Sequence, residues 1–222
     1  EIIKYIDSLG FFETQIISID DLNRNQSYKE NMHRNKSIQS FIDFEDYLAS
    51  LEMKATIFWK SLDNFERLVS LNNKTNQFNT NQVKLSGREL ENYLESSSKF
   101  VLSVGISDKF GDLGIISVMF GNIENGECTI KNWVLSCRVF NRGIEDIALE
   151  ALIMKMHELK IKRIRASIKT TEKNMYCRKV YIDFGFANTQ STEITSEYYL
   201  DIHKYKSKNG GKNGSSITVT FS

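Results

Sequence analysis

Cys137 is the residue with the clearest capacity for covalent chemistry. It ends an apolar, β-rich stretch, it precedes a segment with helical periodicity, and Arg138 follows it directly. A helix N-terminus and a guanidinium both favour the thiolate form of a nearby cysteine, and the thiolate is the nucleophile. We therefore expect Cys137 to act as a nucleophile. A small buried residue at the end of a strand is the competing interpretation.

A second set of polar side chains recurs with helical spacing. Asn174, Cys177, Tyr181 and Gly185 fall at relative positions 0, +3, +7 and +11. A helix with 3.6 residues per turn places these positions on one stripe. The sequence thus predicts a helix over 174–186 that presents an amide, a thiol and a phenol on one face.

The elements that must position these side chains follow a regular order. Apolar alternation predicts strands at 55–59, 100–106, 114–120, 128–137, 164–168 and 197–202. Helical patterns cover 64–73, 86–94, where a capping box begins at Ser86, and 144–159. Residues 74–82, rich in Asn and Thr, are expected to form a loop. The fold class is therefore α/β (α+β), with a mixed sheet.

This order, and the Gly-Phe exit at Gly185, resemble the GNAT acyltransferases and their motif B. The resemblance implies a splayed gap between strands four and five that holds a pantetheine arm. It implies that Asn174 bonds the pantetheine amide and that Tyr181 protonates a departing thiolate. Alternatively, Asn174 caps the helix and Tyr181 packs against the sheet.

The expected phosphate loop departs from the GNAT pattern. Gly143 takes the position of a motif glycine, but Phe140 stands where a basic or amide residue is usual, and Glu145 follows within the loop. A carboxylate among phosphate-facing amides repels a pyrophosphate. CoA binding is possible but not favoured.

A narrower resemblance comes from SCRVFNRGIED together with FEDYLASLEM, NKTNQFNTN and SDKFGDLG. These strings resemble the FkbH-like proteins (HAD subfamily IIIC), in which a phosphatase-like HAD domain precedes a GNAT-like region. The resemblance implies transfer of a glyceryl or related small acyl unit from 1,3-bisphosphoglycerate to the phosphopantetheine of an acyl carrier protein, with Cys137 holding the acyl group as a thioester. The partners are then the carrier protein and the HAD domain, and magnesium belongs to the HAD domain alone.

The expected organisation has three parts. Residues 1–51 form a helical connector that follows a HAD domain, residues 52–203 form the acyltransferase domain, and residues 204–222 form a flexible tail. Within that tail, 217–221 alternates like a strand without an obvious partner.

Further candidates for binding are polar residues near the same loops. Arg138 and Arg142 would contact the carrier's phosphate or its acidic helix, or else be solvated or paired internally. Asn76 and Asn79 would form hydrogen bonds with the glyceryl hydroxyls, and Asp108 would contact the substrate. Turn formation is the alternative role for all three.

Composition excludes several other classes. The 29 basic and 28 acidic residues give a net charge of +1, so neither a nucleic acid nor a membrane is an expected partner. The three cysteines form no CxxC pair, which indicates free thiols and a cytoplasmic protein. No cluster has metal-ligand spacing, and no cofactor is expected in this region. An acetyl-CoA-dependent N-acetyltransferase and a non-catalytic module that docks a carrier protein remain alternatives.

Overall fold

The computed structural model describes residues 29–30, 32–34, 37–38, 41–205 and 217–222. The chain divides into two compact units after Ile42. In the first unit the described positions from 29 to 38 are helical, and Arg34 lies 3.9 Å from Glu30, one turn earlier. Most of the polar N-terminal stretch expected to be helical lies outside the described residues.

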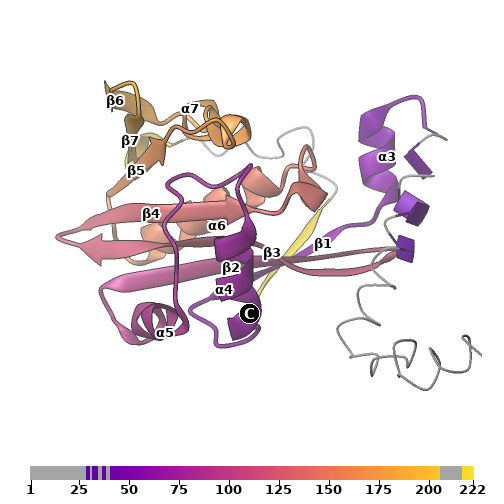
Figure 1. The fold of residues 1–222 in the computed structure, drawn as a ribbon, viewed down its shortest axis with the longest axis horizontal. Helices are drawn as coiled ribbons and strands as arrows, with labels where there is room; N and C mark the ends of the chain where they lie inside the picture. The colour runs from indigo at the N-terminus through magenta and orange to yellow at the C-terminus, as the bar shows by residue number, and fades with distance from the viewer. Residues whose placement is uncertain (1–28, 31, 35–36, 39–40, 206–216) are drawn as a thin grey trace, which may run out of the picture. The chain divides into compact units, whose positions relative to one another are not determined.

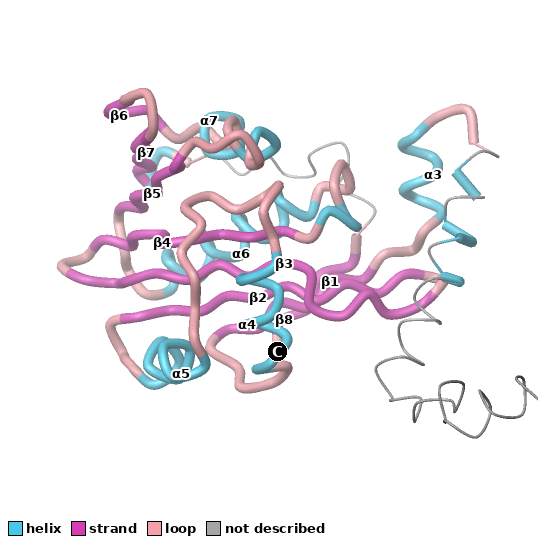
Figure 2. Tube along the Cα trace, viewed as in Figure 1, coloured by secondary structure: helices cyan, strands magenta, loops and turns pink. Residues whose placement is uncertain are grey.

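The described part of the second unit, residues 43–222, is built on one eight-stranded sheet (Figures 1 and 2). The strand order is β6-β7-β5-β4-β3-β2-β1-β8. The strands are β1 (Lys54–Trp59), β2 (Lys99–Asp108), β3 (Gly111–Glu124), β4 (Glu127–Leu135), β5 (Arg163–Lys169), β6 (Ala187–Ser191), β7 (Thr195–Asp201) and β8 (Thr218–Phe221). The pairs β4–β5 and β1–β8 are parallel, and the other neighbouring pairs are antiparallel.

Helices cover both faces of this sheet. They are α3 (Phe44–Ser50), α4 (Phe65–Lys74), α5 (Gly87–Glu95), α6 (Ile144–Glu158) and α7 (Val180–Asp183), with short 3₁₀ turns η1 (Cys137–Val139), η2 (Met175–Cys177) and η3 (Ile202–Lys204). Figure 1 shows α4 and α5 on one face and α6 on the other. The capping box predicted at Ser86 is confirmed, because Ser86 and Glu89 each bond the other's backbone N–H at the start of α5.

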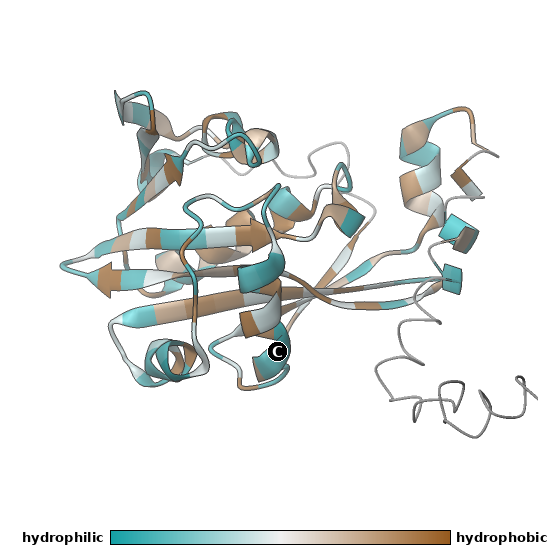
Figure 3. Cartoon of the chain, viewed as in Figure 1, coloured by the Kyte–Doolittle hydropathy of each residue, from teal (hydrophilic) through white to brown (hydrophobic). Residues whose placement is uncertain are grey.

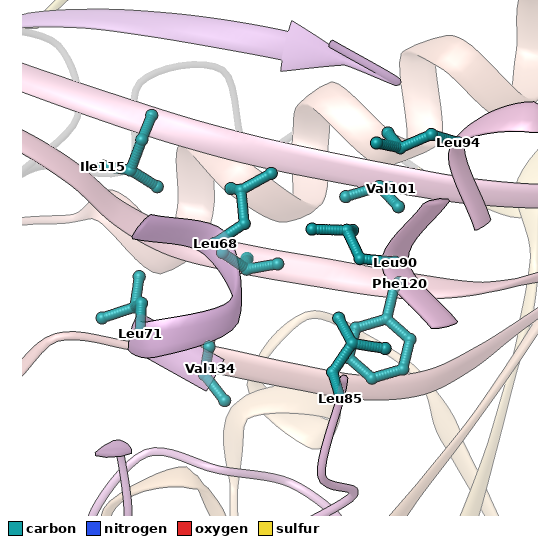
Figure 4. Close-up of a cluster of buried hydrophobic side chains, with 10 residues drawn as sticks. Leu68, Leu71, Leu85, Leu90, Leu94, Val101, Ile115, Phe120 and Val134 are labelled. Carbon is teal, nitrogen blue, oxygen red and sulfur yellow. The ribbon is translucent and has the colours of Figure 1, made fainter. Parts of the chain in front are cut away.

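The core beneath α4 and α5 shows why these segments form an amphipathic layer. Alternate residues of the strands turn apolar side chains toward the helices, and the helices return leucines (Figure 4). The cluster comprises Leu68, Leu71, Leu85, Leu90, Leu94, Val101, Ile115, Val118, Phe120 and Val134. Figure 3 shows the same division, with apolar residues concentrated in the strands and polar ones in the loops.

The structure confirms the mixed α/β sheet and its order of elements, but it corrects two boundaries and adds one strand. Helix α3 belongs to the compact unit that begins at Asp43, not to a connector ending at residue 51; Leu51 is buried and its carbonyl accepts from the Lys109 N–H. Residues Thr218–Phe221 are not a free tail, because β8 pairs with β1 in parallel. The strand β6, which the sequence analysis did not predict, lies at the sheet edge beside β7.

The fourth difference concerns the helix expected over 174–186. The structure has instead the turn η2 and the four-residue helix α7, which ends at Asp183. Gly185 follows two residues later with a left-handed φ of 83°. The predicted stripe nevertheless survives as a buried face, since Asn174, Cys177 and Tyr181 are each 0% exposed.

Candidate active site

Strands β4 and β5 diverge after a short paired stretch. Their register runs from Glu127–Arg163 to Thr129–Arg165 and stops there, although both strands continue. Figures 1 and 2 show β5, β7 and β6 leaving the plane of the remaining strands. The expected splay between strands four and five is therefore present.

The gap between the two strands is filled by the chain itself. The segment Phe78–Asn81, from the loop between α4 and α5, lies against β4 like a short antiparallel strand, with Asn79 opposite Val134. Leu135 donates its N–H to the Phe78 carbonyl at 3.1 Å, and Thr80 donates to the Trp133 carbonyl at 3.0 Å. On the other side, the Lys169 N–H donates to the Thr80 carbonyl at 2.8 Å. The segment thus bridges the strands.

Asparagine side chains fix this segment in place. The Asn81 amide donates to the Lys131 and Ser167 carbonyls, both at 3.0 Å, and therefore ties β4 to β5. The Asn132 side-chain oxygen accepts from the Asn81 backbone N–H at 2.9 Å, and the Asn132 side-chain nitrogen donates to the Asn72 side-chain oxygen at 2.8 Å. Phe78, Asn79 and Thr80 are 1%, 2% and 0% exposed. A buried segment with this many hydrogen bonds to both strands belongs to the fold.

The expectation that this gap grips a pantetheine arm is wrong for this structure. An arm between the strands needs their facing backbone groups, and those of Trp133, Leu135 and Lys169 already bond the inserted segment. The amide of Asn79, expected to read a substrate, donates instead to the Thr75 carbonyl, and its oxygen accepts from the Gln82 N–H. Asn76 alone of the two candidates is exposed.

The Asn174 side chain also holds the inserted segment in place. Its amide donates to the Asn79 carbonyl at 3.0 Å and to the Lys169 carbonyl at 2.8 Å, and its oxygen accepts from the Thr171 N–H at 2.9 Å. Both amide hydrogens are therefore committed within the protein. The side chain holds the end of β5 against the inserted segment and has no donor left for a ligand.

Tyr181 lies sealed at the base of the same region. Its ring packs 5.2 Å from Phe186 and 5.4 Å from Tyr198, measured between ring centroids. Among the described residues no partner lies within ordinary hydrogen-bond distance of its hydroxyl, although the Thr80 side chain is near enough to oppose the rise in its pKa slightly. Burial raises the pKa of Tyr181 above its usual range, and the neighbouring Cys177 thiol raises it further. The phenol is therefore held neutral and out of contact with solvent.

The loop before α6 is closed by aromatic side chains. The Phe140 ring stacks on Tyr176 with centroids 3.8 Å apart, and Phe78 packs against both. The Tyr176 hydroxyl donates to the Asn141 side chain at 2.8 Å and accepts from the Asn141 N–H at 3.0 Å. Gly143 precedes the helix at a left-handed φ of 74°, which explains the glycine. Phe140 thus has a packing role here.

A pocket of about 370 Å³ opens at this helix N-terminus, and its lining is acidic. It includes Glu145, Asp146 and Asp183, beside Tyr176 and Asn141. Burial raises the pKa of Glu145, and the Asp146 charge raises it further; burial, with the Glu145 charge, raises the pKa of Tyr176 to about 12. Carboxylates in this position disfavour a pyrophosphate, as the sequence predicted.

Cys137, unlike the buried residues described above, is exposed to solvent. It begins η1, immediately after β4, and it is exposed, whereas Cys128 and Cys177 are buried. Ser136 donates its N–H to the Ile116 carbonyl at 2.8 Å, and the Arg138 guanidinium donates to the Leu113 carbonyl at 3.2 Å. The thiol is therefore presented on a turn that β3 holds on both sides. Its burial at a strand end, the competing interpretation, is excluded.

The remaining candidates lie on the hairpin next to this turn. Asp108 accepts from the Phe110 and Gly111 N–H groups and so forms the β2–β3 turn. Its side chain is buried, 3.9 Å from Arg142. Asp108 and Arg142 therefore form a buried ion pair. Sequence reasoning missed Arg67, whose guanidinium bonds the Ile115 carbonyl next to this turn; a single arginine on a helix gives no signal of that.

Metal and membrane chemistry find no support in the described residues. No group of three His, Cys, Asp or Glu side chains there could hold a metal ion. No helix in the described ranges combines the length and the apolarity that crossing a bilayer requires.

Comparison with solved structures identifies the architecture. The ribosomal-protein-S18-alanine N-acetyltransferase from Escherichia coli is similar at a TM-score of 0.52 and 11% identity, over 67% of this chain and 94% of that one. A GNAT-family acetyltransferase from Streptococcus pneumoniae gives 0.52 and 16%, over 67% and 99%. The spermidine N-acetyltransferase from Vibrio cholerae, solved with CoA and spermine, gives 0.52 and 14%, over 68% and 98%. The domain has the GNAT fold.

The likeness extends to the fold alone at these identities. No protein-family model matches the chain, and no curated protein sequence matches it. Within the GNAT fold, the chain departs from the expected ligand geometry in two places: its own segment fills the gap between β4 and β5, and carboxylates line the pocket at the N-terminus of α6.

Proposed function

We propose that the GNAT-fold domain is an acyltransferase that carries a small acyl group on Cys137. The observation that carries the proposal is the exposed thiol at the end of β4, pinned to β3 by its two neighbours in the chain. A nucleophile must be both accessible and held in place, and among the three cysteines only Cys137 is exposed.

The reaction has two balanced steps. The Cys137 thiolate attacks the carbonyl of an acyl phosphate, a carbon–sulfur bond forms, and the phosphate leaves with the electrons of the broken carbon–oxygen bond. The thiol of a carrier's phosphopantetheine then attacks the thioester, and its proton passes to the departing Cys137 sulfur. The second step exchanges one thioester for another, so it needs no further energy source.

The resemblance to FkbH-like proteins suggests the substrates: a glyceryl unit derived from 1,3-bisphosphoglycerate, and an acyl carrier protein as the acceptor. A HAD domain of the same polypeptide would supply the donor. Because the gap between β4 and β5 is filled, the carrier's arm reaches Cys137 from the solvent side of the η1 turn and not through the sheet.

Two other functions are weighed against this one. An acetyl-CoA-dependent N-acetyltransferase needs a site for pyrophosphate and pantetheine, and the acidic pocket and the inserted segment both oppose it. A non-catalytic module that docks a carrier protein is favoured by the filled gap, since docking needs no ligand slot. The exposed thiol of Cys137 supports transfer over docking, because docking alone needs no accessible nucleophile.

The test uses the full-length protein with its HAD domain, incubated with 1,3-bisphosphoglycerate and then with a carrier protein. Intact mass spectrometry should show a gain of one glyceryl group that maps to Cys137 and moves to the carrier. Cys137→Ala should abolish loading, whereas Cys177→Ala, a buried thiol, should retain it. Carrier loading unchanged in Cys137→Ala would reject the thioester and favour the docking module.

A further inference from the structure

A second pocket, of about 310 Å³, opens over β1, β2 and β3 at the N-terminus of α4. We call it the Gly105 pocket, and it shares no residue with the acidic pocket at α6. Because a water occupies about 30 Å³ of the liquid, this volume holds roughly ten groups of that size. The side chains that line it include two apolar ones, Phe58 and Ile115, and four polar ones, Thr56, Asn64, Ser107 and Asp112.

Gly105 leaves this pocket open, although the fold does not require a glycine there. Glycine inside a strand is unfavourable, because it costs backbone entropy and packs no side chain. The register of β2 shifts beside Gly105, but its φ does not lie in the left-handed region that would demand glycine. A Cβ at this position would lie 3.4 Å from the Phe58 ring and 3.6 Å from Ile115 Cδ1, which are ordinary contact distances. Neither conformation nor packing therefore explains the residue.

Gly121, on β3, shows what a glycine required by packing looks like. A Cβ there would lie 2.0 Å from the Thr129 carbonyl oxygen, so the neighbouring strand excludes every side chain. At Gly105 the space that a side chain would occupy belongs instead to the pocket. A strand glycine that leaves such space is typical of a place where a ligand approaches the backbone.

The polar groups of the pocket match a ligand that carries hydroxyl groups. The Ser107 hydroxyl and the Asn64 side chain have no hydrogen-bond partner among the described residues. The Thr56 hydroxyl has only a long contact, 3.4 Å, with the Thr220 hydroxyl. One Asp112 oxygen accepts from the Gly114 N–H at 2.7 Å, which leaves the other oxygen as an acceptor. Together these groups offer both donors and acceptors, as the hydroxyl groups of a ligand do.

The charges around the pocket favour a neutral ligand. Asp112 is the one charged side chain among the described residues that line it, and its carboxylate repels an anion. The N-terminus of α4, where the Asn64 side chain makes no capping bond, disfavours a cation. Phe58 and Ile115 provide an apolar surface for the C–H groups of a small carbon chain.

We propose that the Gly105 pocket binds a small uncharged polyol or sugar of up to roughly ten non-hydrogen atoms. Asp112 and the N–H groups of the first turn of α4 would contact its hydroxyls, together with Ser107, Thr56 and Asn64. The inference goes beyond the proposed function, because binding here requires neither the Cys137 thiol nor a carrier protein.

The first experiment tests the class of ligand. Saturation-transfer difference NMR on the full-length protein compares erythritol with 1,4-butanediol, which has the same carbon chain but lacks two of the hydroxyls. Erythritol should bind at least about fivefold more tightly, because the diol cannot form the hydrogen bonds of the missing groups. Erythronate, the anionic relative, should bind more weakly than erythritol. Absence of erythritol binding, equal affinity for the diol, or tighter binding of erythronate would overturn the proposal.

The second experiment tests the place of binding. Gly105→Ala puts a methyl group into the pocket between Phe58 and Ile115, and it should weaken erythritol binding about fivefold. Ser107→Ala, which removes one hydroxyl, should weaken it about threefold. Gly87→Ala, on α5, is the matched control, because its Cβ also meets only ordinary contacts but lies outside the lining; it should leave the affinity unchanged. Unchanged affinity in Gly105→Ala, with the variant folded by circular dichroism, would overturn the site.

Discussion

The turn at Cys137 and the stripe from Asn174 to Tyr181 follow the two strands that border one gap, yet their surroundings are opposite. The thiol in the turn is exposed, and the next residue, Arg138, ties the turn to the Leu113 carbonyl. The stripe is buried, and the Asn174 side-chain amide donates to the Asn79 carbonyl of the inserted segment and to the Lys169 carbonyl of β5. A reacting side chain must be accessible to the substrate and must have polar groups that are not already bonded within the protein. The difference therefore favours the turn as the place of any reaction, and it indicates that the stripe stabilises the fold.

Asn174→Ala should show the largest effect, and on stability. The change removes three hydrogen bonds and leaves the Asn79 and Lys169 carbonyls and the Thr171 N–H without their partner. We expect a loss of about 3 kcal/mol in the free energy of unfolding, measured by urea denaturation. Asn76→Ala, in the exposed part of the inserted loop, should change it by less than about 0.5 kcal/mol.

If Asn174→Ala were as stable as the wild type and instead lost only affinity for a carrier, the comparison would reverse. Asn174 would then be a ligand-binding residue, and the inserted segment would have to leave the gap on binding.

Tyr181→Phe should have a smaller effect of the opposite sign. The Tyr181 hydroxyl is buried, and the nearby Thr80 side chain compensates it only weakly, beyond ordinary hydrogen-bond distance, so its removal relieves a desolvation cost and should stabilise the protein by less than about 1 kcal/mol. Tyr176→Phe is the matched control, because that hydroxyl makes two hydrogen bonds with Asn141 and its loss should destabilise. Thermal unfolding of the two variants measures the difference.

Transfer to the carrier should continue in Tyr181→Phe, since a sealed phenol cannot protonate a thiolate at the exposed turn. Loss of transfer in a stable Tyr181→Phe would show instead that the hydroxyl reaches the reaction.

The comparison also shows which parts of the fold the sequence could supply. The order of strands and helices and the capping box at Ser86 depend on local spacing, and both were predicted. The burial of the stripe was only the alternative to its predicted contact with a ligand. The absence of a long helix over 174–186 was not predictable, because Asn174 caps the end of β5 in place of a helix, and α7 then ends after one turn, before Gly185. Spacing alone cannot separate a buried 3₁₀ turn from a helix.

The filled gap depends on contacts between residues far apart in the chain. Asn81 and Asn132 are separated by 51 residues, and Asn81 reaches Ser167 across 86. The string NKTNQFNTN predicted a loop correctly, but nothing in it shows that the loop enters the sheet. The partner of β8 was hidden for the same reason, because β1 lies more than 150 residues earlier. The position of Cys137 directly after a strand was predictable because it depends on local sequence, and its role as a nucleophile stays a prediction.

Glu145→Gln should give the smallest effect. It tests whether the buried carboxylate of the acidic pocket destabilises the folded protein at neutral pH. Burial raises the pKa of Glu145, so the folded state disfavours the ionised carboxylate. That penalty is absent below the ordinary glutamate range, where the side chain is protonated whether the chain is folded or unfolded, and it grows as pH rises through the folded-state pKa. Glu145→Gln should therefore raise Tm by about 2 °C at pH 7, and the gain should vanish near pH 4.

Glu89→Gln is the control of opposite sign, because bonds from Ser86 lower the pKa of Glu89, and its replacement should not raise Tm at any pH. A gain in Glu145→Gln that did not depend on pH would show that ionisation of the buried carboxyl is not the source of the destabilisation, and it would contradict this account of the pocket.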